Sequence, residues 1–428
     1  MQQVTEIEVK KRLALDNPWW ETGKADRRFT DLPRRAYFDG FYKLLAETDV
    51  RRAVVMMGPR RVGKTVMIHQ AVQRLLDKKV PARNILYMSI DTPIYTGVWL
   101  EKLLTFFMEL HRHNRDSKLY VFYDEIQYHK DWEIHLKSLV DSYHSVEFCA
   151  SGSAAAALKM KSRESGAGRF TDFILPPLTF AEFLRFRGVE DELFDEKLNA
   201  KDINALNNEF IHYLNFGGFP EAVLKEDVRE GMERYVADDI IDKVLLRDLP
   251  SLYGISDPQE LNRLFTTLAY NTGQEISIDE LSKSSNVAKN TLKKYLDYLE
   301  AAFLIRRLYR VDQNARRLKR LSHFKVYLAN PCLRTALFGA IGPDDPAMGL
   351  MTETAIASQL AHGLSFKFTY YARWKSGEVD YVILHAGTQN PAYALEVKWS
   401  DRAFLKPAIE LSSLLKFYKV IFNWFLTL

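Results

Sequence analysis

The 428-residue chain has little cysteine, glycine and proline, and it has no long apolar run. Its two cysteines, Cys149 and Cys332, cannot build a disulfide framework. No charged segment followed by an apolar run opens the chain, and no apolar stretch reaches the roughly 20 residues that a membrane span requires. Only 20 glycines and 15 prolines are present, which excludes collagenous and disordered compositions. We therefore expect a globular, cytoplasmic protein with no membrane partner.

An excess of charge of one sign is also absent. The 59 Lys and Arg residues against 55 Asp and Glu give a net charge of +4, which predicts no class of partner unless the charges are unevenly placed. The length allows about three domains of typical size. Turn-forming residues cluster at 250–258 and 339–349. With the N-terminal arm, these clusters predict four sections, residues 1–50, 51–250, 251–338 and 339–428.

Short β-branched and aliphatic runs alternate with helical stretches in the second section. The alternation is typical of an α/β fold with a parallel sheet covered by helices. Residues 181–250 are mostly of helical pattern and are interpreted as a helical lid. In the first section, an Asn-Pro-Trp-Trp cluster and a helix at 36–46 predict an arm that packs against another element. The predicted strands are 53–57, 85–90, 119–123 and 146–150.

A phosphate-binding loop directly follows the first predicted strand. It has the pattern G-x-x-x-x-G-K-[ST] in the required order of strand, loop and helix. The glycines let successive backbone N–H groups face the phosphates of a nucleotide. Lys64 is expected to contact the β- and γ-phosphates, and the Thr65 hydroxyl to bind Mg²⁺. The nucleotide-binding residues are Gly58, Pro59, Arg60, Arg61, Val62, Gly63, Lys64 and Thr65.

Two carboxylates end the strand predicted at 119–123. This position is the carboxyl edge of the sheet, where open α/β sheets bind ligands. Asp124 is expected to bind Mg²⁺, and Glu125 to polarise the attacking water. Neither D-x-x-G nor N-K-x-D follows, which favours ATP over a guanine nucleotide.

Two further polar groups follow the fourth predicted strand. Ser153, within Ser-Gly-Ser at 151–153, is placed to contact the γ-phosphate or the water, although a turn of small residues has the same composition. Arg169 lies after a glycine-rich stretch and would neutralise charge in the transition state, in its own subunit or in a neighbour's. The alternative for Arg169 is an ion pair with a surface carboxylate.

Five segments together resemble the archaeal-type AAA ATPases, P-loop proteins with a C-terminal domain of uncharacterised function. The resemblance implies ATP hydrolysis with Lys64, Thr65, Asp124 and Glu125 in the roles above, Ser153 as the polar sensor, Arg169 as the arginine finger, and residues 217–220 as the loop that leads into the lid. The segments are GPRRVGKT (58–65), YDEIQ (123–127), the helix that starts at 132, residues 151–184 and NFGGFPEAV (215–223).

Positive charge is concentrated between residues 281 and 325, where twelve Lys or Arg residues stand against three acids. A helix at 278–284, a turn and a second helix with an apolar face are followed by two strands, 305–311 and 319–328. This order predicts a winged helix. Lys289, Lys293, Lys294 and the basic wing at 306–320 are the expected contacts to DNA phosphates. A solvated lysine face or a module that binds protein gives the same pattern.

The last section has a nuclease-like constellation. A helix with Glu353 precedes a strand at 368–374, a second strand with Asp380 and a third with Glu396 and Lys398. An acid followed by E-x-K on an adjacent strand is the arrangement of restriction-endonuclease-like folds, and the family's C-terminal domain is similar to this fold. Asp380, Glu396 and Glu353 would bind Mg²⁺, and Lys398 would activate water.

Two features depart from these patterns. The segment 326–333 lacks the acid that the resemblance implies near Asn330. The chain stops at 420–428, where an apolar strand begins, so we expect an incomplete nuclease-like core. The whole predicts a P-loop NTPase of the ASCE or AAA-like type with a helical lid, then a winged helix and a restriction-endonuclease-like α/β domain. One predicted function is that of a homo-oligomeric ATPase, coupled to a DNA-binding winged helix and a nuclease-like domain, that acts on nucleic acid. Mg²⁺-dependent DNA cleavage by the last domain would be an additional activity. The alternative is an ATP-dependent regulatory or scaffolding switch with an inactive nuclease-like domain.

Overall fold

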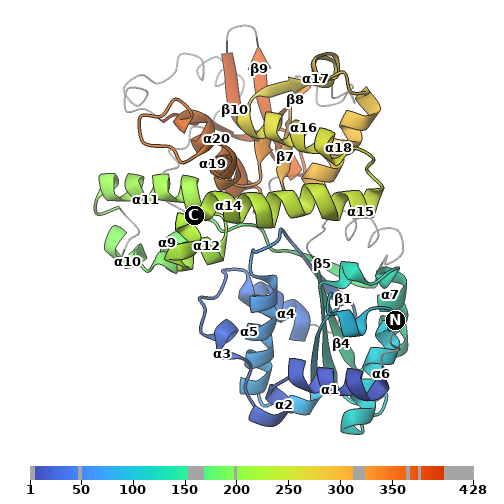
Figure 1. The fold of residues 1–428 in the computed structure, drawn as a ribbon. Coiled ribbons are helices and arrows are strands. Elements are labelled where there is room, and N and C mark those ends of the chain that lie inside the picture. Colours follow the sequence, from blue (N-terminus) through green and yellow to red (C-terminus); the bar gives the residue numbers. More distant parts are fainter. Residues whose placement is uncertain are drawn as a thin grey trace. The chain divides into compact units, whose positions relative to one another are not determined.

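The computed structural model describes residues 5–46, 51–152, 168–196, 200–311, 323–362, 367–374 and 377–399. It divides into two compact units, residues 1–176 and 177–428 (Figure 1). Within the described ranges, no helix has the length and apolar character needed to cross a membrane. The boundary between the units falls inside the predicted section 51–250, and the four predicted sections stay a prediction. The apolar stretch at 420–428 lies outside the described residues.

A five-stranded parallel sheet in the order β2-β3-β4-β1-β5 forms the centre of the first unit. Its inner strands are buried on both faces, as their continuous apolar sequences require. The α/β class and the four predicted strands are confirmed, whereas β5 was not among the predicted strands. The strands are β1 (Ala53–Met57), β2 (Ile85–Ser89), β3 (Leu119–Asp124), β4 (Val146–Gly152) and β5 (Phe170–Ile174).

Helices cover both faces of this sheet (Figure 1). Figure 1 shows α4 and α5 on one side of the strands and α6 and α7 on the other. The chain moves from β1 out to β2 and then back through β3 to β4, so right-handed crossovers place α5 opposite α6 and α7. The bounds are α1 (Glu6–Asp16), α2 (Trp19–Thr22), α3 (Arg27–Thr30), α4 (Phe38–Ala46), α5 (Lys64–Asp77), α6 (Leu100–His111) and α7 (Trp132–Ser142), with short 3₁₀ turns at Ala82–Asn84, Pro93–Tyr95 and Ile126–Tyr128.

The N-terminal arm covers the edge strand β2. The Asn17 side chain accepts a hydrogen bond from the Tyr87 N–H at 2.6 Å and donates to the Tyr87 carbonyl at 2.9 Å. The Trp19 and Trp20 indoles both donate to the Ile85 carbonyl. An uncovered edge strand would present these groups to another chain. Side chains of the Asn-Pro-Trp-Trp cluster therefore provide hydrogen-bond partners for backbone groups of the edge strand.

The second unit begins with helices, as predicted for residues 181–250. A buried apolar cluster packs them together around Tyr213 and Leu214 of α11. The helices are α9 (Phe180–Arg187), α10 (Glu190–Leu193), α11 (Ile203–Phe216), α12 (Pro220–Leu224), α13 (Glu226–Glu230), α14 (Met232–Val236) and α15 (Leu249–Tyr253), with π-helical turns at Ala237–Asp242 and Val244–Asp248.

Two small antiparallel sheets follow, in the orders β6-β8-β7 and β11-β10-β9. In α18, the apolar positions predicted to form one face are buried, and α17 meets α18 through a turn at Asn286. The elements are α16 (Pro258–Tyr270), β6 (Glu275–Ser277), α17 (Ile278–Ser285), α18 (Lys289–Ala301), β7 (Ile305–Tyr309), β8 (His323–Leu328), α19 (Cys332–Phe338), α20 (Met348–Leu360), β9 (Thr369–Trp374), β10 (Gly377–Leu384) and β11 (Pro391–Leu395).

Candidate nucleotide-binding and nuclease-like sites

The backbone of the P-loop, residues 58–65, requires both of its glycines. A Cβ atom at Gly58 would lie 2.1 Å from the Leu175 carbonyl oxygen, so no side chain fits there. Gly63 has φ +94° where the loop enters α5, a conformation that other residues rarely adopt. The close approach and the left-handed turn place the loop at the amino end of α5, where the free N–H groups of a helix attract anions.

Lys64 is buried, and its ammonium group lies within the loop. Its Nζ donates to the carbonyl oxygens of Pro59 and Gly58 at 2.8 and 3.1 Å. Arg60 lies on the outer side of the loop and donates to the Tyr128 hydroxyl at 3.2 Å. The loop therefore contains a cation that an anionic ligand can draw out of its carbonyl contacts.

Asp124 accepts hydrogen bonds from three neighbouring elements. Thr65 Oγ1 of α5 donates to Asp124 Oδ2 at 2.6 Å, and the Tyr87 hydroxyl of β2 donates to the same oxygen at 3.0 Å. The Ser151 hydroxyl of β4 donates to Oδ1. A buried carboxylate beside three hydroxyl oxygens is a set of hard oxygen donors that suits Mg²⁺. The residues expected to bind this ion therefore fit it.

Glu125 follows Asp124 with a positive φ of 51°, in the left-handed region. Burial raises the pKa of Glu125, and the nearby Asp124 charge raises it as well, while the Lys64 ammonium opposes the shift. The Gln127 amide donates to its carboxylate. A carboxylate with a raised pKa is a stronger base toward water.

Ser151, rather than Ser153, is the described serine that reaches Asp124. Ser153 lies outside the described residues, so its predicted role stays a prediction. The sequence did contain a signal for Ser151. It lies near the carboxyl end of β4, and β4 is the neighbour of β3, which ends in Asp124. No local pattern identifies Tyr87, because its contact with Asp124 depends on how β2 and β3 align.

Arg169 lies at the opposite edge of the sheet from the P-loop. Its carbonyl accepts a hydrogen bond from the Ala53 N–H at the amino end of β1, and its guanidinium pairs with Asp141 at 2.6 Å. The P-loop follows the carboxyl end of β1. A role for Arg169 in the site of its own chain is therefore corrected to the alternative, a surface ion pair.

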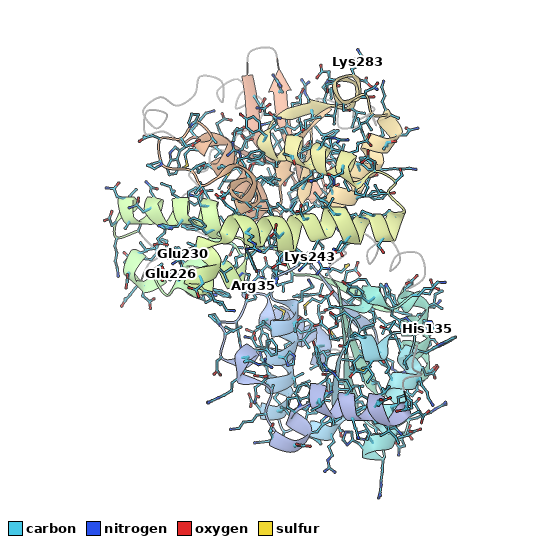
Figure 2. All side chains as sticks on the ribbon, viewed as in Figure 1. Arg35, His135, Glu226, Glu230, Lys243 and Lys283 are labelled. Carbon is cyan, nitrogen blue, oxygen red and sulfur yellow. The ribbon has the colours of Figure 1, made fainter. Side chains whose placement is uncertain are left out.

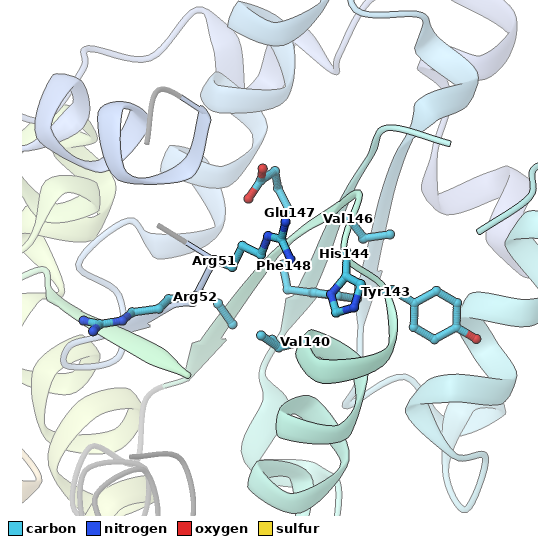
Figure 3. A pocket seen from close by; sticks show the side chains of 9 residues that line it. Arg51, Arg52, Val140, Tyr143, His144, Val146, Glu147 and Phe148 are labelled. Carbon is cyan, nitrogen blue, oxygen red and sulfur yellow. The ribbon is translucent and has the colours of Figure 1, made fainter. Parts of the chain in front are cut away.

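A small pocket lies at that same amino edge (Figure 3). It lies between the starts of β1 and β4 and the end of α7, so the strands separate it from the carboxyl edge with Asp124 and the P-loop. It is therefore separate from the nucleotide site. The lining residues are Arg51, Arg52, Ala53, Val140, Tyr143, His144, Val146, Glu147 and Phe148.

The basic segment of the second unit exposes several lysines. Lys283, Lys293 and Lys294 are exposed on α17 and α18, and Figure 2 shows Lys283 at the outer side of α17. Lys289 is exposed too, but its Nζ pairs with Asp279 at 2.5 Å.

The wing predicted at 306–320 is described only to residue 311. Arg307 of β7 is mostly buried and pairs with Asp297 at 2.7 Å and with Glu300 at 2.5 Å. It is therefore corrected from a phosphate contact to an internal ion pair that joins β7 to α18.

Glu353 and Asp380, two acids of the nuclease-like constellation, lie beside a lysine that belongs to the basic segment 281–325. Lys325 of β8 is only 4% exposed and lies 2.9 Å from Glu353 and 3.4 Å from Asp380, and it also pairs with Glu378. Burial lowers the pKa of Lys325, but the neighbouring carboxylates raise it above its usual value. Among the described residues, no group of three His, Cys, Asp or Glu side chains is arranged to hold a metal ion. The structure thus places an ammonium group between Glu353 and Asp380.

Glu396 and Lys398 follow strand β11, which ends at Leu395, so the prediction that both lie on a strand is wrong by one to three residues. Their side chains still meet, with Lys398 Nζ 2.5 Å from Glu396 Oε1. Asp380 Oδ2 accepts a hydrogen bond from the Val397 N–H at 2.9 Å. The structure brings Asp380 to the E-x-K segment, but it pairs Lys398 with Glu396.

Asn330, found where an acid was expected, is buried against the glycine loop at 217–220. Its Nδ2 donates to the Tyr213 hydroxyl at 3.3 Å, and its Oδ1 accepts from the Cys332 N–H at 3.0 Å. A Cβ atom at Gly218 would lie 2.7 Å from the Asn330 side chain. The neutral amide therefore satisfies a buried donor and a buried acceptor at once.

The sheet order and the P-loop beside Asp124 have the arrangement of a P-loop NTPase fold. Residues 50–184 match the AAA domain family, and residues 207–344 match a domain of unknown function, DUF8612. The two family matches together cover most of the described sheet, helices and basic segment.

The chain is also similar to individual proteins and solved structures. An uncharacterized protein of Haemophilus influenzae is 27% identical over 265 residues, which cover 60% of this chain and 62% of that protein. One from Methanocaldococcus jannaschii is 24% identical over 360 residues, 79% of this chain and 74% of that protein. Among solved structures, Aeropyrum pernix ORC1 in complex with DNA has 12% identity and a TM-score of 0.34, with 74% of this chain and 95% of that chain covered. A variant of Thermotoga maritima RuvB has 18% identity and a TM-score of 0.32, with 75% and 92% covered.

Proposed function

We propose that the first unit binds and hydrolyses Mg²⁺-ATP. The observation that carries this proposal is the convergence of Thr65 and Ser151 on the buried Asp124, beside the loop at the amino end of α5. Hydroxyl and carboxylate oxygens at this position are the donors that a nucleotide-bound magnesium ion requires.

Each residue has a distinct role in this proposal. The P-loop amides and the Lys64 ammonium bind the phosphates, and the buried position of Lys64 favours its transfer from the loop carbonyls to an anion. Thr65 and Asp124 hold Mg²⁺, which when bound neutralises charge on the phosphates. Glu125 accepts a proton from the attacking water, for which its raised pKa suits it.

Lys64→Ala is expected to lower ATP hydrolysis to background, because the variant loses the cation that meets the β- and γ-phosphates. Steady-state phosphate release by the full chain measures this effect. Arg74→Ala on the same helix, far from the loop, is the control and is expected to keep the wild-type rate. Wild-type turnover in Lys64→Ala would contradict the assignment.

For the second unit we propose a winged helix that binds duplex DNA. The helices α17 and α18, with the sheet β6-β8-β7 behind them, support this fold, and the exposed Lys293 and Lys294 supply positive charge on α18. Lys289 contributes less, because Asp279 already neutralises it. Arg169 is exposed at the far edge of the first unit, so a catalytic role for it would require a homo-oligomer in which it enters a neighbour's site.

The affinity for a labelled DNA duplex is expected to fall steeply between low and moderate salt, because bound phosphates release counterions. Replacing Lys293 and Lys294 by glutamine is expected to weaken binding to all sequences and to reduce the slope of log affinity against log salt by about 2. Fluorescence anisotropy measures both. Lys225→Gln, which removes an exposed lysine between α12 and α13 that pairs with Glu221, is the control. Binding that does not respond to salt would contradict the proposal.

The contacts of Lys325 favour the second candidate function, a regulatory or scaffolding switch. We propose that the last section has a restriction-endonuclease-like fold without nuclease activity, because the Lys325 ammonium group already pairs with both Glu353 and Asp380. A Mg²⁺ ion and an ammonium group cannot both occupy the space between these carboxylates. The two candidates differ in one observable, which is DNA cleavage that depends on Mg²⁺ and Asp380.

A further inference from the structure

Arg35, in the arm before α4, is a buried charged residue whose contacts lead to the P-loop. It is 5% exposed, and Figure 2 labels it. Its Nη1 donates to the Val62 carbonyl at 2.8 Å, and its Nη2 donates to the Pro176 carbonyl at 2.9 Å. Hydrogen bonds from a charged group are stronger than those between neutral groups. One guanidinium therefore joins the end of the P-loop to the segment that follows β5.

The segment after β5 also contacts the start of the P-loop. The Leu175 N–H donates to the Met57 carbonyl at 2.7 Å, and the Leu175 carbonyl lies against Gly58 so closely that no Cβ atom fits between them. Pro176 follows directly. Arg35 thus holds residue 62 at one end of the loop to a segment that is itself fixed at the other end, next to Gly58.

The contact to Val62 determines where a phosphate-facing amide points. The Val62 carbonyl and the Gly63 N–H belong to one planar trans peptide, so the two groups point in opposite directions. A carbonyl held by Arg35 therefore turns the Gly63 N–H away from Arg35. Gly63 belongs to the loop whose N–H groups surround the β-phosphate in the P-loop motif.

We propose that Arg35 is a positioning residue for nucleotide binding, which fixes the Val62–Gly63 peptide so that its N–H faces the phosphates. This inference rests on the proposed ATPase function. Arg35 acts through the backbone of the loop and does not itself contact the nucleotide. Loss of Arg35 leaves the Val62 carbonyl buried without this donor and lets the peptide rotate.

The test compares Arg35→Met, Arg35→Lys and, as the matched control, Arg34→Met, since Arg34 is the exposed neighbour. Competition against a fluorescent ADP analogue gives the affinities for AMP, ADP and ATP with Mg²⁺. Arg35→Met is expected to lower the affinity for ADP and ATP about tenfold or more. The affinity for AMP, which lacks a β-phosphate, is expected to change little. Arg35→Lys, which can donate to only one carbonyl at a time, is expected to lie between Arg35→Met and the wild type.

The dependence on phosphate number separates positioning from a general effect on folding. If Arg35 had a merely structural role, its loss would lower the affinities for AMP, ADP and ATP by the same factor. That result would overturn the inference. Equal ADP affinity in Arg35→Met and Arg34→Met would overturn it too. If Arg35→Met does not fold, the test uses Arg35→Lys. A folded Arg35→Lys variant with wild-type ADP affinity would also overturn the inference. If neither the wild type nor Arg34→Met binds ADP or ATP, the proposed ATPase function fails as well.

Discussion

Glu125→Gln is expected to lower the rate of ATP hydrolysis by about 100-fold or more while it leaves the affinity for ATP near that of the wild type. The glutamine amide has the shape of the carboxylate but accepts no proton from water. ATP binding depends on other groups, the P-loop amides, Lys64 and Thr65. Burial raises the pKa of Glu125 in the wild type, and substitution removes this base while its neighbours Asp124 and Gln127 remain.

Single-turnover hydrolysis and ATP binding, measured on the same preparation, separate the two effects. Glu147→Gln is the control, because Glu147 lies at the amino edge of β4 and pairs with Lys118, away from the P-loop. This control is expected to hydrolyse ATP like the wild type. A Glu125→Gln variant with the wild-type rate would remove Glu125 from the mechanism and leave the activation of water to another group.

Lys325→Met is expected to lower the free energy of unfolding by about 3 kcal/mol or more. The substitution leaves Glu353, Glu378 and Asp380 close together without the cation that pairs with all three. Chemical denaturation of the full chain without nucleotide measures the change. Lys293→Met, at an exposed position of α18, is the control and is expected to change stability by less than about 0.5 kcal/mol.

The same variant tests whether Lys325 occupies a cation position. Millimolar Mn²⁺ is expected to stabilise Lys325→Met more than the wild type, because the carboxylates are then free to bind it. Wild-type protein with Mg²⁺ and ATP is expected to leave supercoiled, linear and single-stranded DNA intact. Two results would contradict this account: wild-type stability in Lys325→Met, or wild-type cleavage that is lost in Asp380→Ala.

The arrangement of the candidate nucleotide site could be predicted from the sequence because its determinants are local. The P-loop pattern fixes the turn from β1 into α5, and an apolar strand that ends in Asp124 and Glu125 identifies the adjacent carboxylates. The helices α17 and α18 could likewise be predicted from the sequence, since the spacing of their apolar residues alone determines which face is buried. In each case a residue's neighbours along the chain determine its position.

The remaining contacts depend on how distant segments align. Lys325 belongs to a basic segment by sequence, and only the placement of β8 near β10 and α20 brings it to Glu353 and Asp380. Arg35 likewise has no motif, because it recognises backbone carbonyls, which every residue provides. Strand β5 was missed because its sequence mixes polar and apolar residues, as an edge strand with partial exposure allows.

Calorimetric titration of the purified full chain with ATP tests the central claim most directly. With Mg²⁺ present, we expect one ATP to bind per chain, with much weaker binding by Lys64→Ala and by the wild type in EDTA. A folded wild-type protein that takes up no ATP, or that binds it equally well after loss of Lys64, would contradict the assignment of the loop at 58–65 and Asp124 as a nucleotide site.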